Sequence, residues 1–479
     1  MKHAFLYFLL VALLQVQFAM AKSDRYRITL TIHNTPDTVM YMGYYYAENS
    51  YILDTAHIDR KGRFVFSSES RSLFPGMYFF SASSTRWMDF VVYNEKPFFS
   101  FTTDERDWID NMTVRGSVEN EILFNYKRGS NRIYDDYVVQ MQSADSADRP
   151  RIHKEMERRQ RDLKSQYIRE YPTRMISLVM RSTSDIAATV PTHAPDGDSL
   201  SQHDRYTYFM EHYFDSMPLH DDMLVHTPKS VFYQRVMDYY DVFLKSALPE
   251  TIIYYTDRMI EKARPSKENF KWLVHTVKEK FLHSNITLYE AVVVHMVKTY
   301  YASGDAYWCS ASTIDEMTTL AEKWDRLLIG RTAPELILFD SLHVPHSLHH
   351  LPNRYKLLVF WSPTCGHCKT VIPELYERYK LLSQEYDIGT FAILSEPDDA
   401  TRVLWHRFIA RHHLDWLNLD GGEANIDWHD VYDVVTTPQI YLLDEHNTII
   451  AKKLGADTFE RVVRSFCHPK SEPYAVPQR

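Results

Sequence analysis

Residues 356–375 read KLLVFWSPTCGHCKTVIPEL. The stretch begins with an apolar run that is typical of a buried strand, and it continues into a segment with a helical pattern. Cys365 and Cys368 lie at the junction, with Gly366 and His367 between them. A strand followed by a C-x-x-C pair at the start of a helix predicts an α/β domain that carries two neighbouring thiols.

The C-x-x-C spacing has direct consequences for thiol chemistry. It lets the two sulfur atoms meet in a small ring, and the positive end of the helix dipole stabilises a thiolate at Cys365. Cys368 is expected to lie deeper, where its sulfur can attack a mixed disulfide formed by Cys365. His367 offers a positive partner for the first sulfur. The pair therefore predicts reversible thiol–disulfide exchange.

Other interpretations of the cysteines and histidines stay open. A zinc site is one alternative, although the sequence has no second C-x-x-C or C-x-x-H to complete four ligands. A purely structural disulfide is another. The histidine-rich segment 341–350, SLHVPHSLHH, is explained by a polar turn as well as by a metal site. Cys309 and Cys467 lack a motif, and we expect them to be buried apolar residues, with mutual pairing as the alternative.

A proline near the end of the chain strengthens the redox interpretation. Pro438 follows Thr436 and Thr437 and directly precedes QIYLLD, which has a strand pattern. A proline at this point of an α/β redox domain is often cis, which would bring the backbone of Thr437 beside the cysteines. An ordinary trans proline at the start of an edge strand is the alternative.

The rest of the chain changes its pattern twice. Residues 26–34, YRITLTIHN, alternate strictly, and further short strands follow, so we expect an antiparallel β-sandwich over residues 22–108. Amphipathic helical segments then predict an all-α domain over 109–328. Strands alternate with helices over 329–479, which predicts the α/β domain that carries the cysteines.

Composition and the N-terminus restrict location and partners. The 479 residues are 45% hydrophobic and 24% charged, as in ordinary globular proteins, and a net charge of −9 without a basic stripe argues against nucleic-acid binding.

Residues 4–19 are apolar and are followed by an A-x-A arrangement ending at Ala21, which predicts a signal peptide over 1–21. A retained membrane anchor is the alternative, but the run is short. The mature chain is expected in the periplasm or cell envelope, where a dithiol can be oxidised, with no stable membrane span.

Taken together, these motifs resemble the thioredoxin-fold thiol–disulfide oxidoreductases of the TlpA/ResA-like branch. The residues that carry the resemblance are FWSPTCGHCK at 360–369, Pro373 in the helix that follows, TTPQIYLLD at 436–444 and TAPELILFD at 332–340. The resemblance implies that Cys365 is the attacking thiol, Cys368 the resolving thiol and Pro438 the cis-proline. Trp361 matches the tryptophan that packs beside the pair. The leading domains are similar to those of Bacteroidetes envelope proteins, which adds no mechanism.

The sequence departs from thioredoxins proper at two points. Thioredoxins carry a buried Asp in the strand before the cysteines, and the matching residue here is Val359. The proton acceptor for Cys368 is therefore open. Glu374 is one candidate, and a solvated helix residue is the other interpretation of it. The dipeptide between the cysteines is Gly-His, as in protein disulfide isomerase.

The resemblance implies an envelope thiol–disulfide oxidoreductase that exchanges electrons with protein dithiols or disulfides and with an unknown envelope donor or acceptor. The chemistry needs no metal or organic cofactor. One alternative is a binding module whose disulfide is only structural. A second is a thiol peroxidase, but that enzyme would carry its cysteine behind P-x-x-x-T/S, a spacing that residues 363–365 do not supply.

We predict that the mature chain begins at Lys22 and is recovered from the periplasm without detergent, because a short apolar segment that ends in A-x-A is removed on export. N-terminal sequencing of the protein from fractionated cells measures this. An intact Met1 in the membrane fraction would contradict the prediction.

Overall fold

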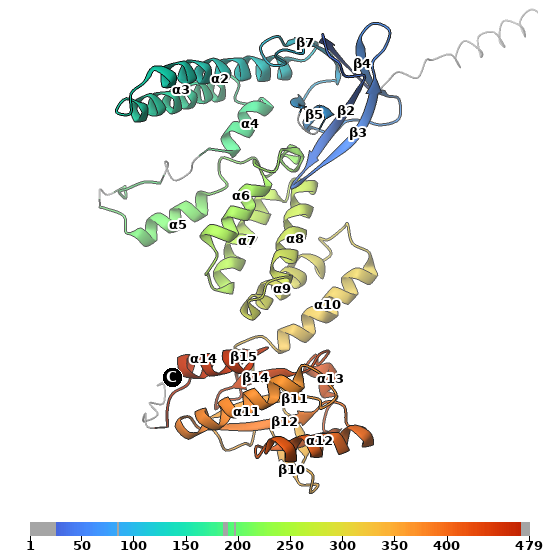
Figure 1. Cartoon of the computed structure of the whole chain (residues 1–479), viewed down its shortest axis with the longest axis vertical. Coiled ribbons are helices and arrows are strands. Elements are labelled where there is room, and N and C mark those ends of the chain that lie inside the picture. Colours follow the sequence, from blue (N-terminus) through green and yellow to red (C-terminus); the bar gives the residue numbers. More distant parts are fainter. Residues whose placement is uncertain (1–24, 84–85, 185–189, 196–197, 471–479) are drawn as a thin grey trace, which may run out of the picture. The chain divides into compact units, whose positions relative to one another are not determined.

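The computed structural model describes residues 25–83, 86–184, 190–195 and 198–470 (Figure 1). The predicted signal peptide lies outside the described residues. The chain divides into two compact units. The first unit comprises residues up to 247 together with 254–273, and the second comprises 248–253 together with residues from 274 onward.

The first unit opens with two four-stranded sheets, in the orders β4-β1-β7-β8 and β3-β2-β5-β6. Along β1, alternate side chains are buried, so Ile28 and Leu30 enter the core with Phe64 and Phe101. The sheet-rich N-terminal region predicted from the alternating pattern is thereby confirmed. The strands are β1 (Tyr26–His33), β2 (Val39–Tyr46), β3 (Asn49–His57), β4 (Arg63–Ser68), β5 (Gly76–Ser83), β6 (Arg86–Val92), β7 (Phe98–Asp104) and β8 (Thr113–Arg115).

The expectation of a purely antiparallel sandwich was wrong at one pairing. β1 pairs with β7 in parallel, with Ile28 opposite Phe99 and Leu30 opposite Phe101. Parallel neighbours need a long connection between them, and here β2 to β6 lie between the two strands in the sequence. The alternation of side chains that predicts a strand is the same for both directions, so it could not predict this pairing. β8 lies beyond residue 108, where we expected the strands to end.

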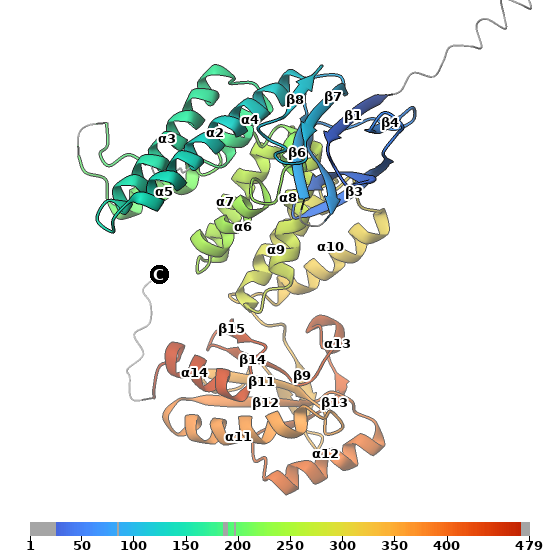
Figure 2. The same cartoon turned by 45° about the horizontal axis from the view of Figure 1, so that its top comes forward.

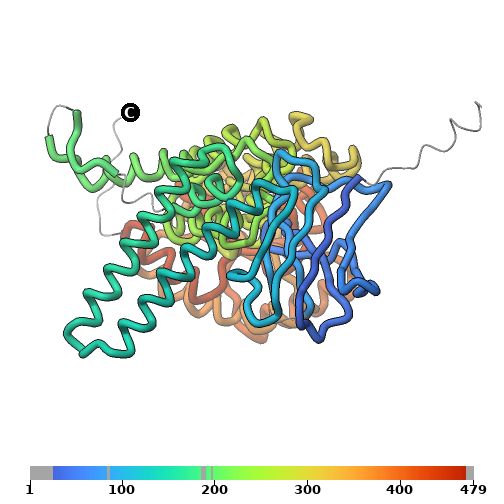
Figure 3. Tube along the Cα trace, turned by 90° about the horizontal axis from the view of Figure 1, so that it is seen from above, coloured from blue at the N-terminus to red at the C-terminus, as the bar shows by residue number. Residues whose placement is uncertain are grey.

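Helices follow the strands, as expected for the middle of the chain. Ser117 caps α2 by accepting a hydrogen bond from the Asn120 backbone N–H at 3.1 Å. α2 and α3 lie side by side as a long hairpin (Figures 1 and 3). The α-helices of this region are α2 (Val118–Ser143), α3 (Arg149–Glu170), α4 (Met175–Ser182), α5 (Gln202–His212), α6 (Tyr233–Asp238), α7 (Pro249–Ala263) and α8 (Lys267–Leu282). Between them lie the 3₁₀ turn η2 (Asp222–His226) and the π segment η3 (Tyr239–Phe243).

The second unit contains the last helices of the middle region and the C-terminal α/β fold. Its leading elements are η4 (Thr287–Tyr289), α9 (Glu290–Met296), the π segment η5 (Val297–Tyr301) and α10 (Ala311–Arg326). A seven-stranded mixed sheet follows, in the order β10-β9-β13-β12-β11-β14-β15. Its strands are β9 (Ile337–Phe339), β10 (Pro345–Ser347), β11 (Tyr355–Trp361), β12 (Ile388–Leu394), β13 (Asn418–Ala424), β14 (Gln439–Leu443) and β15 (Ile449–Lys452).

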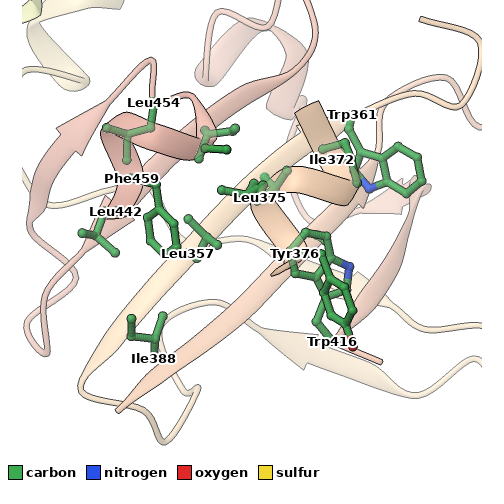
Figure 4. Close-up of a cluster of buried hydrophobic side chains, with 14 of the residues drawn as sticks. Leu357, Trp361, Ile372, Leu375, Tyr376, Ile388, Trp416, Leu442, Leu454 and Phe459 are labelled. Atoms are coloured by element: carbon green, nitrogen blue, oxygen red, sulfur yellow. The ribbon is translucent and has the colours of Figure 1, made fainter. Parts of the chain in front are cut away.

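Helices cover both faces of this sheet, and β11 lies in its interior between β12 and β14 (Figure 2). One core packs α11 (Cys368–Glu385), α12 (Asp399–His412) and α14 (Ala456–Phe466) on the sheet, and Figure 4 shows Leu357, Ile372, Leu375 and Phe459 in it. The opposite core contains Trp428 of α13 (Trp428–Val431) and Leu327, which follows α10. All seven residues of β11 are buried, so the strand that leads to the cysteines is held on both faces.

Candidate active site

The C-x-x-C segment lies where β11 ends and α11 begins. α11 starts at Cys368, and His367 is its N-cap residue. Cys365 precedes the helix and is partly exposed, whereas Cys368 is fully buried in the core beneath it. The backbone N–H of Cys368 donates a hydrogen bond to the Cys365 Sγ at 3.4 Å. One sulfur therefore faces the surface and the other lies behind it, and both are present as thiols.

The loop before β14 completes the site. The peptide bond between Thr437 and Pro438 is cis. The Cys365 thiol donates a hydrogen bond to the Thr437 carbonyl oxygen at 3.2 Å. β14 pairs antiparallel with β11, so the residues that precede β14 lie at the end of the sheet where β11 ends. A backbone segment far from the cysteines in the sequence thus lies against the outer sulfur.

The surroundings of the two thiols drive their acidities in opposite directions. Partial burial opposes a Cys365 thiolate, but hydrogen bonds from the Thr437 side chain and from the backbone N–H groups of Cys368 and His367 outweigh it and lower the pKa of Cys365. Burial raises the pKa of Cys368 to about 12. At neutral pH the outer sulfur is therefore the better nucleophile.

The remaining residues of the motif surround this pair. Trp361 is fully buried at the end of β11, and its ring lies 5.2 Å from that of Phe408, between ring centroids. Gly366 and His367 are exposed. A Cβ on Gly366 would meet no atom within 4 Å, so close packing does not require glycine there.

The proton acceptor for Cys368 stays a prediction. Val359 is fully buried in β11, where thioredoxins proper have the Asp. Glu374 is exposed on α11, whereas the Cys368 sulfur lies in the core. This exposure favours the interpretation of Glu374 as a solvated helix residue.

Sequence reasoning missed one carboxylate beside the site. Glu396 follows β12, and its Oε2 accepts hydrogen bonds from Ser362 Oγ at 2.8 Å and Thr364 Oγ1 at 2.6 Å. These hydrogen bonds lower the pKa of Glu396, so the group is ionised at neutral pH. β11 and β12 are parallel neighbours, and their carboxyl ends meet at one edge of the sheet. An acidic residue just after the second strand was the signal available in the sequence.

The other candidate residues have local partners. His346 Nε2 lies 3.0 Å from Asp340 Oδ2, and His349 Nε2 lies 2.7 Å from the Ala333 carbonyl oxygen. Within the described residues, no group of three or more His, Cys, Asp or Glu side chains is arranged to hold a metal ion. Cys309 and Cys467 are separate free thiols, the first partly buried and the second buried.

Parts of the chain are similar to known proteins. Residues 26–123 match a domain of unknown function (DUF4369), and residues 181–319 match a second one (DUF5106). A 142-residue part of the chain, 29% of its length, is 25% identical to the thiol-disulfide oxidoreductase ResA of a Bacillus cereus strain and covers 76% of that protein.

Solved structures are similar as well. A thioredoxin-like protein from Bacteroides caccae aligns with 58% of this chain and 98% of its own, at 20% identity and a TM-score of 0.46. A domain of a possible thiol-disulfide isomerase from Cytophaga hutchinsonii aligns with 29% of this chain and 92% of its own, at 30% identity and a TM-score of 0.27.

We predict that iodoacetamide alkylates Cys365 much faster than Cys368 in the reduced protein. Only thiolates react, so the alkylation rate at Cys365 should rise with pH and then level off. The pH at which the rate is half-maximal gives the pKa of Cys365, which should be below the roughly 8.5 of an unperturbed cysteine. Cys368 should stay unreactive over the same range, because burial raises its pKa. Mass spectrometry of samples quenched at pH values from about 5 to about 9, on both sides of ordinary thiol titration, gives both rates. Equal rates at low pH would contradict the assignment.

Proposed function

We propose that this chain, which is a thioredoxin-like thiol–disulfide oxidoreductase, exchanges electrons with exported protein substrates through Cys365 and Cys368. The observation that carries the proposal is the position of the Cys365 sulfur. It is partly exposed, it lies within hydrogen-bond distance of the Thr437 carbonyl, and a second thiol is buried behind it. This arrangement supplies a nucleophile and a resolving group in one place.

The proposed reaction begins with the Cys365 thiolate. It attacks one sulfur of a substrate disulfide and forms a mixed disulfide, while the other substrate sulfur leaves as a thiolate and takes up a proton. Cys368 then loses its proton and attacks Cys365 Sγ, which releases the first substrate sulfur as a thiol. The substrate has gained two electrons and two protons, and the enzyme pair has become a disulfide.

The second step depends on a change in charge at the first sulfur. Burial is the main reason why the Cys368 pKa is high, and the neighbouring Cys365 sulfur raises it further. Once Cys365 is bound in a mixed disulfide, its negative charge is gone and this contribution disappears. Formation of the intermediate therefore favours deprotonation of the thiol that must resolve it.

The partners and the location are part of the proposal. An envelope dithiol would reduce the Cys365–Cys368 disulfide again, or an envelope oxidant would take the electrons if the cycle runs in the opposite direction. Export is supported by the apolar segment 4–19 and by the small residues that follow it. Across the described parts of the chain, the structure contains no helix of the length and apolar character that a membrane crossing requires.

We also propose three regions along the chain: a β-sandwich over residues 22–108 to which β8 (Thr113–Arg115) is added, a helical region that follows it up to residue 328, and a redox region over 329–479. The β-sandwich and the redox region have separate hydrophobic cores, which supports the outer parts of this division. The last helices of the middle region belong to the same compact unit as the redox region, so the two are structurally connected.

We predict that Cys365→Ser abolishes dithiothreitol-coupled insulin reduction, because serine cannot form the mixed disulfide. Cys309→Ser is the matched control, since it removes a thiol of the same unit outside the motif, and it should retain a nearly unchanged rate. Cys368→Ala should trap substrates as mixed disulfides that mass spectrometry identifies. If wild type and Cys365→Ser reduce insulin equally slowly, the pair is a structural disulfide in a binding module.

We predict that His367→Pro lowers the reduction potential by on the order of 30 mV or more and raises the Cys365 pKa. The substitution removes the imidazole and also the backbone N–H that helps to lower this pKa. His367→Ala keeps the N–H and separates the two causes. Glutathione titrations of the three proteins measure the potentials. A shift in both variants assigns the effect to the imidazole, a shift in the proline variant alone assigns it to the N–H, and no shift in either contradicts a role for residue 367.

A further inference from the structure

A pocket of about 180 Å³ lies within the second unit, beside the loop that carries the cis-proline. Trp324 and Leu327, at the end of α10, contribute to one wall. Val435, Thr436 and Tyr441, from the loop before β14 and from β14 itself, contribute to the other. The pocket therefore combines a helix that precedes the redox region with the segment next to the reactive sulfur.

The helical wall is fixed to the redox region by polar contacts. Lys323 Nζ of α10 pairs with Asp430 Oδ1 at 2.5 Å, and Trp324 Nε1 donates a hydrogen bond to Asp433 Oδ2 at 3.3 Å. Beyond α10, the backbone N–H of Gly330 donates to the Ile449 carbonyl oxygen at 2.8 Å. The ion pair, the indole hydrogen bond and the backbone hydrogen bond thus hold Trp324 in place beside the loop that precedes β14.

An ion triad with two buried members and one exposed member also lines the pocket. Glu290 of α9 forms an ion pair with Lys452 and a second with Lys453, the latter at 2.8 Å between Oε1 and Nζ. The Glu290 and Lys452 side chains are buried, so their charges are already engaged with each other. Lys453 Nζ also lies 5.7 Å from the centroid of the Trp324 ring.

Two residues of the pocket directly precede, in the sequence, the residue that contacts the Cys365 sulfur. Val435 is 82% exposed, Thr436 lines the pocket, and the next residue, Thr437, accepts the hydrogen bond from Cys365 Sγ. An extended chain advances roughly 3.3 Å per residue, so Val435 and Thr437 are separated by about 7 Å of backbone at most. A peptide whose cysteine reaches Cys365 can therefore place a neighbouring side chain in the pocket.

We propose that this pocket binds one apolar or aromatic side chain of an extended substrate segment, close to the disulfide that Cys365 attacks. The proposal rests on the proposed function and adds a substrate class to it. It assigns a substrate-binding role to Trp324, which lies outside the C-x-x-C and proline motifs.

Size and charge both favour an uncharged side chain. A cavity of about 150 Å³ accommodates a benzene ring, so this pocket has room for one ring or one branched aliphatic group. The charged residues that line it, Lys452, Lys453, Glu290 and Asp433, balance in charge. A charged substrate residue would have to compete with the ion pairs and hydrogen bonds that these groups already make. The Val435 side chain and the Trp324 ring offer apolar contact instead.

The test measures the second-order rate constant for reduction of peptide disulfides by the reduced full-length chain, in single-turnover stopped-flow experiments. The peptides differ only in one residue, which is Gly, Leu, Phe, Lys or Glu, placed at each of the three positions on either side of the reactive cysteine. At one of these positions we expect Phe or Leu to react about tenfold faster than Gly, and Lys and Glu to show no such gain.

Substitutions of residues that line the pocket test whether the pocket causes the preference for Phe or Leu over Gly. Trp324→Ala and Val435→Asp should reduce the Phe-to-Gly ratio to near one, and Trp324→Phe should retain most of it. Leu342→Asp is the matched control for Val435→Asp, because Leu342 is also 82% exposed but lies in the turn between β9 and β10. It should leave the ratio at the wild-type value. The alkylation rate of Cys365, measured in parallel, shows whether a variant has disturbed the thiol itself.

The outcomes separate this inference from the proposed function. If the wild type reduces the peptides without a side-chain preference at any position, or prefers Lys or Glu, the pocket does not bind apolar side chains and the proposed function still stands. The same conclusion follows if Trp324→Ala and Val435→Asp keep the preference. If wild type and Cys365→Ser are equally inactive on every peptide, the proposed function fails, and this inference fails with it.

Discussion

The buried strand β11 is the constraint on which the redox site depends. All seven of its residues are inaccessible, including Lys356, whose Nζ contacts the Asn447 side chain. Hydrogen bonds to β12 on one side and β14 on the other fix its register. Since β12 runs parallel to β11 and β14 runs antiparallel, the end of β12 and the start of β14 lie at the edge where β11 ends. The Glu396 carboxylate and the Thr437 carbonyl therefore lie beside the cysteines.

The two thiols show how one short motif produces two different chemical environments. Only Gly366 and His367 separate Cys365 from Cys368 along the chain, yet one sulfur lies at the surface before the helix and the other in the core. Hydrogen bonds stabilise the outer thiolate more than partial burial opposes it, whereas burial dominates at the inner thiol. In the proposed reaction, attack and resolution therefore follow from the depth of each sulfur in the fold, and a proton acceptor close to Cys368 is not required for the first step.

The sequence predicted the local features of the site better than the contacts between distant segments. The C-x-x-C pair, the helix after it and the proline before β14 all lie within short stretches, and the resemblance to thioredoxin-like oxidoreductases followed from them. The parallel pairing of β1 with β7 was not predictable from alternation, which has the same period for either direction. Glu396 was missed for a related reason, because it reaches the site through tertiary pairing of segments that carry no motif. The contact of Trp324 with Asp433 is of the same kind.

These distant contacts bear on how a thioredoxin-like domain gains selectivity. The reactive sulfur and the Thr437 carbonyl can serve any accessible disulfide, since they contact only sulfur and backbone. Selectivity requires contacts with side chains that flank the cysteine. In this chain such contacts are available from α10, because the Lys323–Asp430 pair and the Glu290 ion triad hold that helix and α9 against the redox region. The helices that precede the redox region thereby supply a wall that the C-x-x-C and proline motifs alone do not provide.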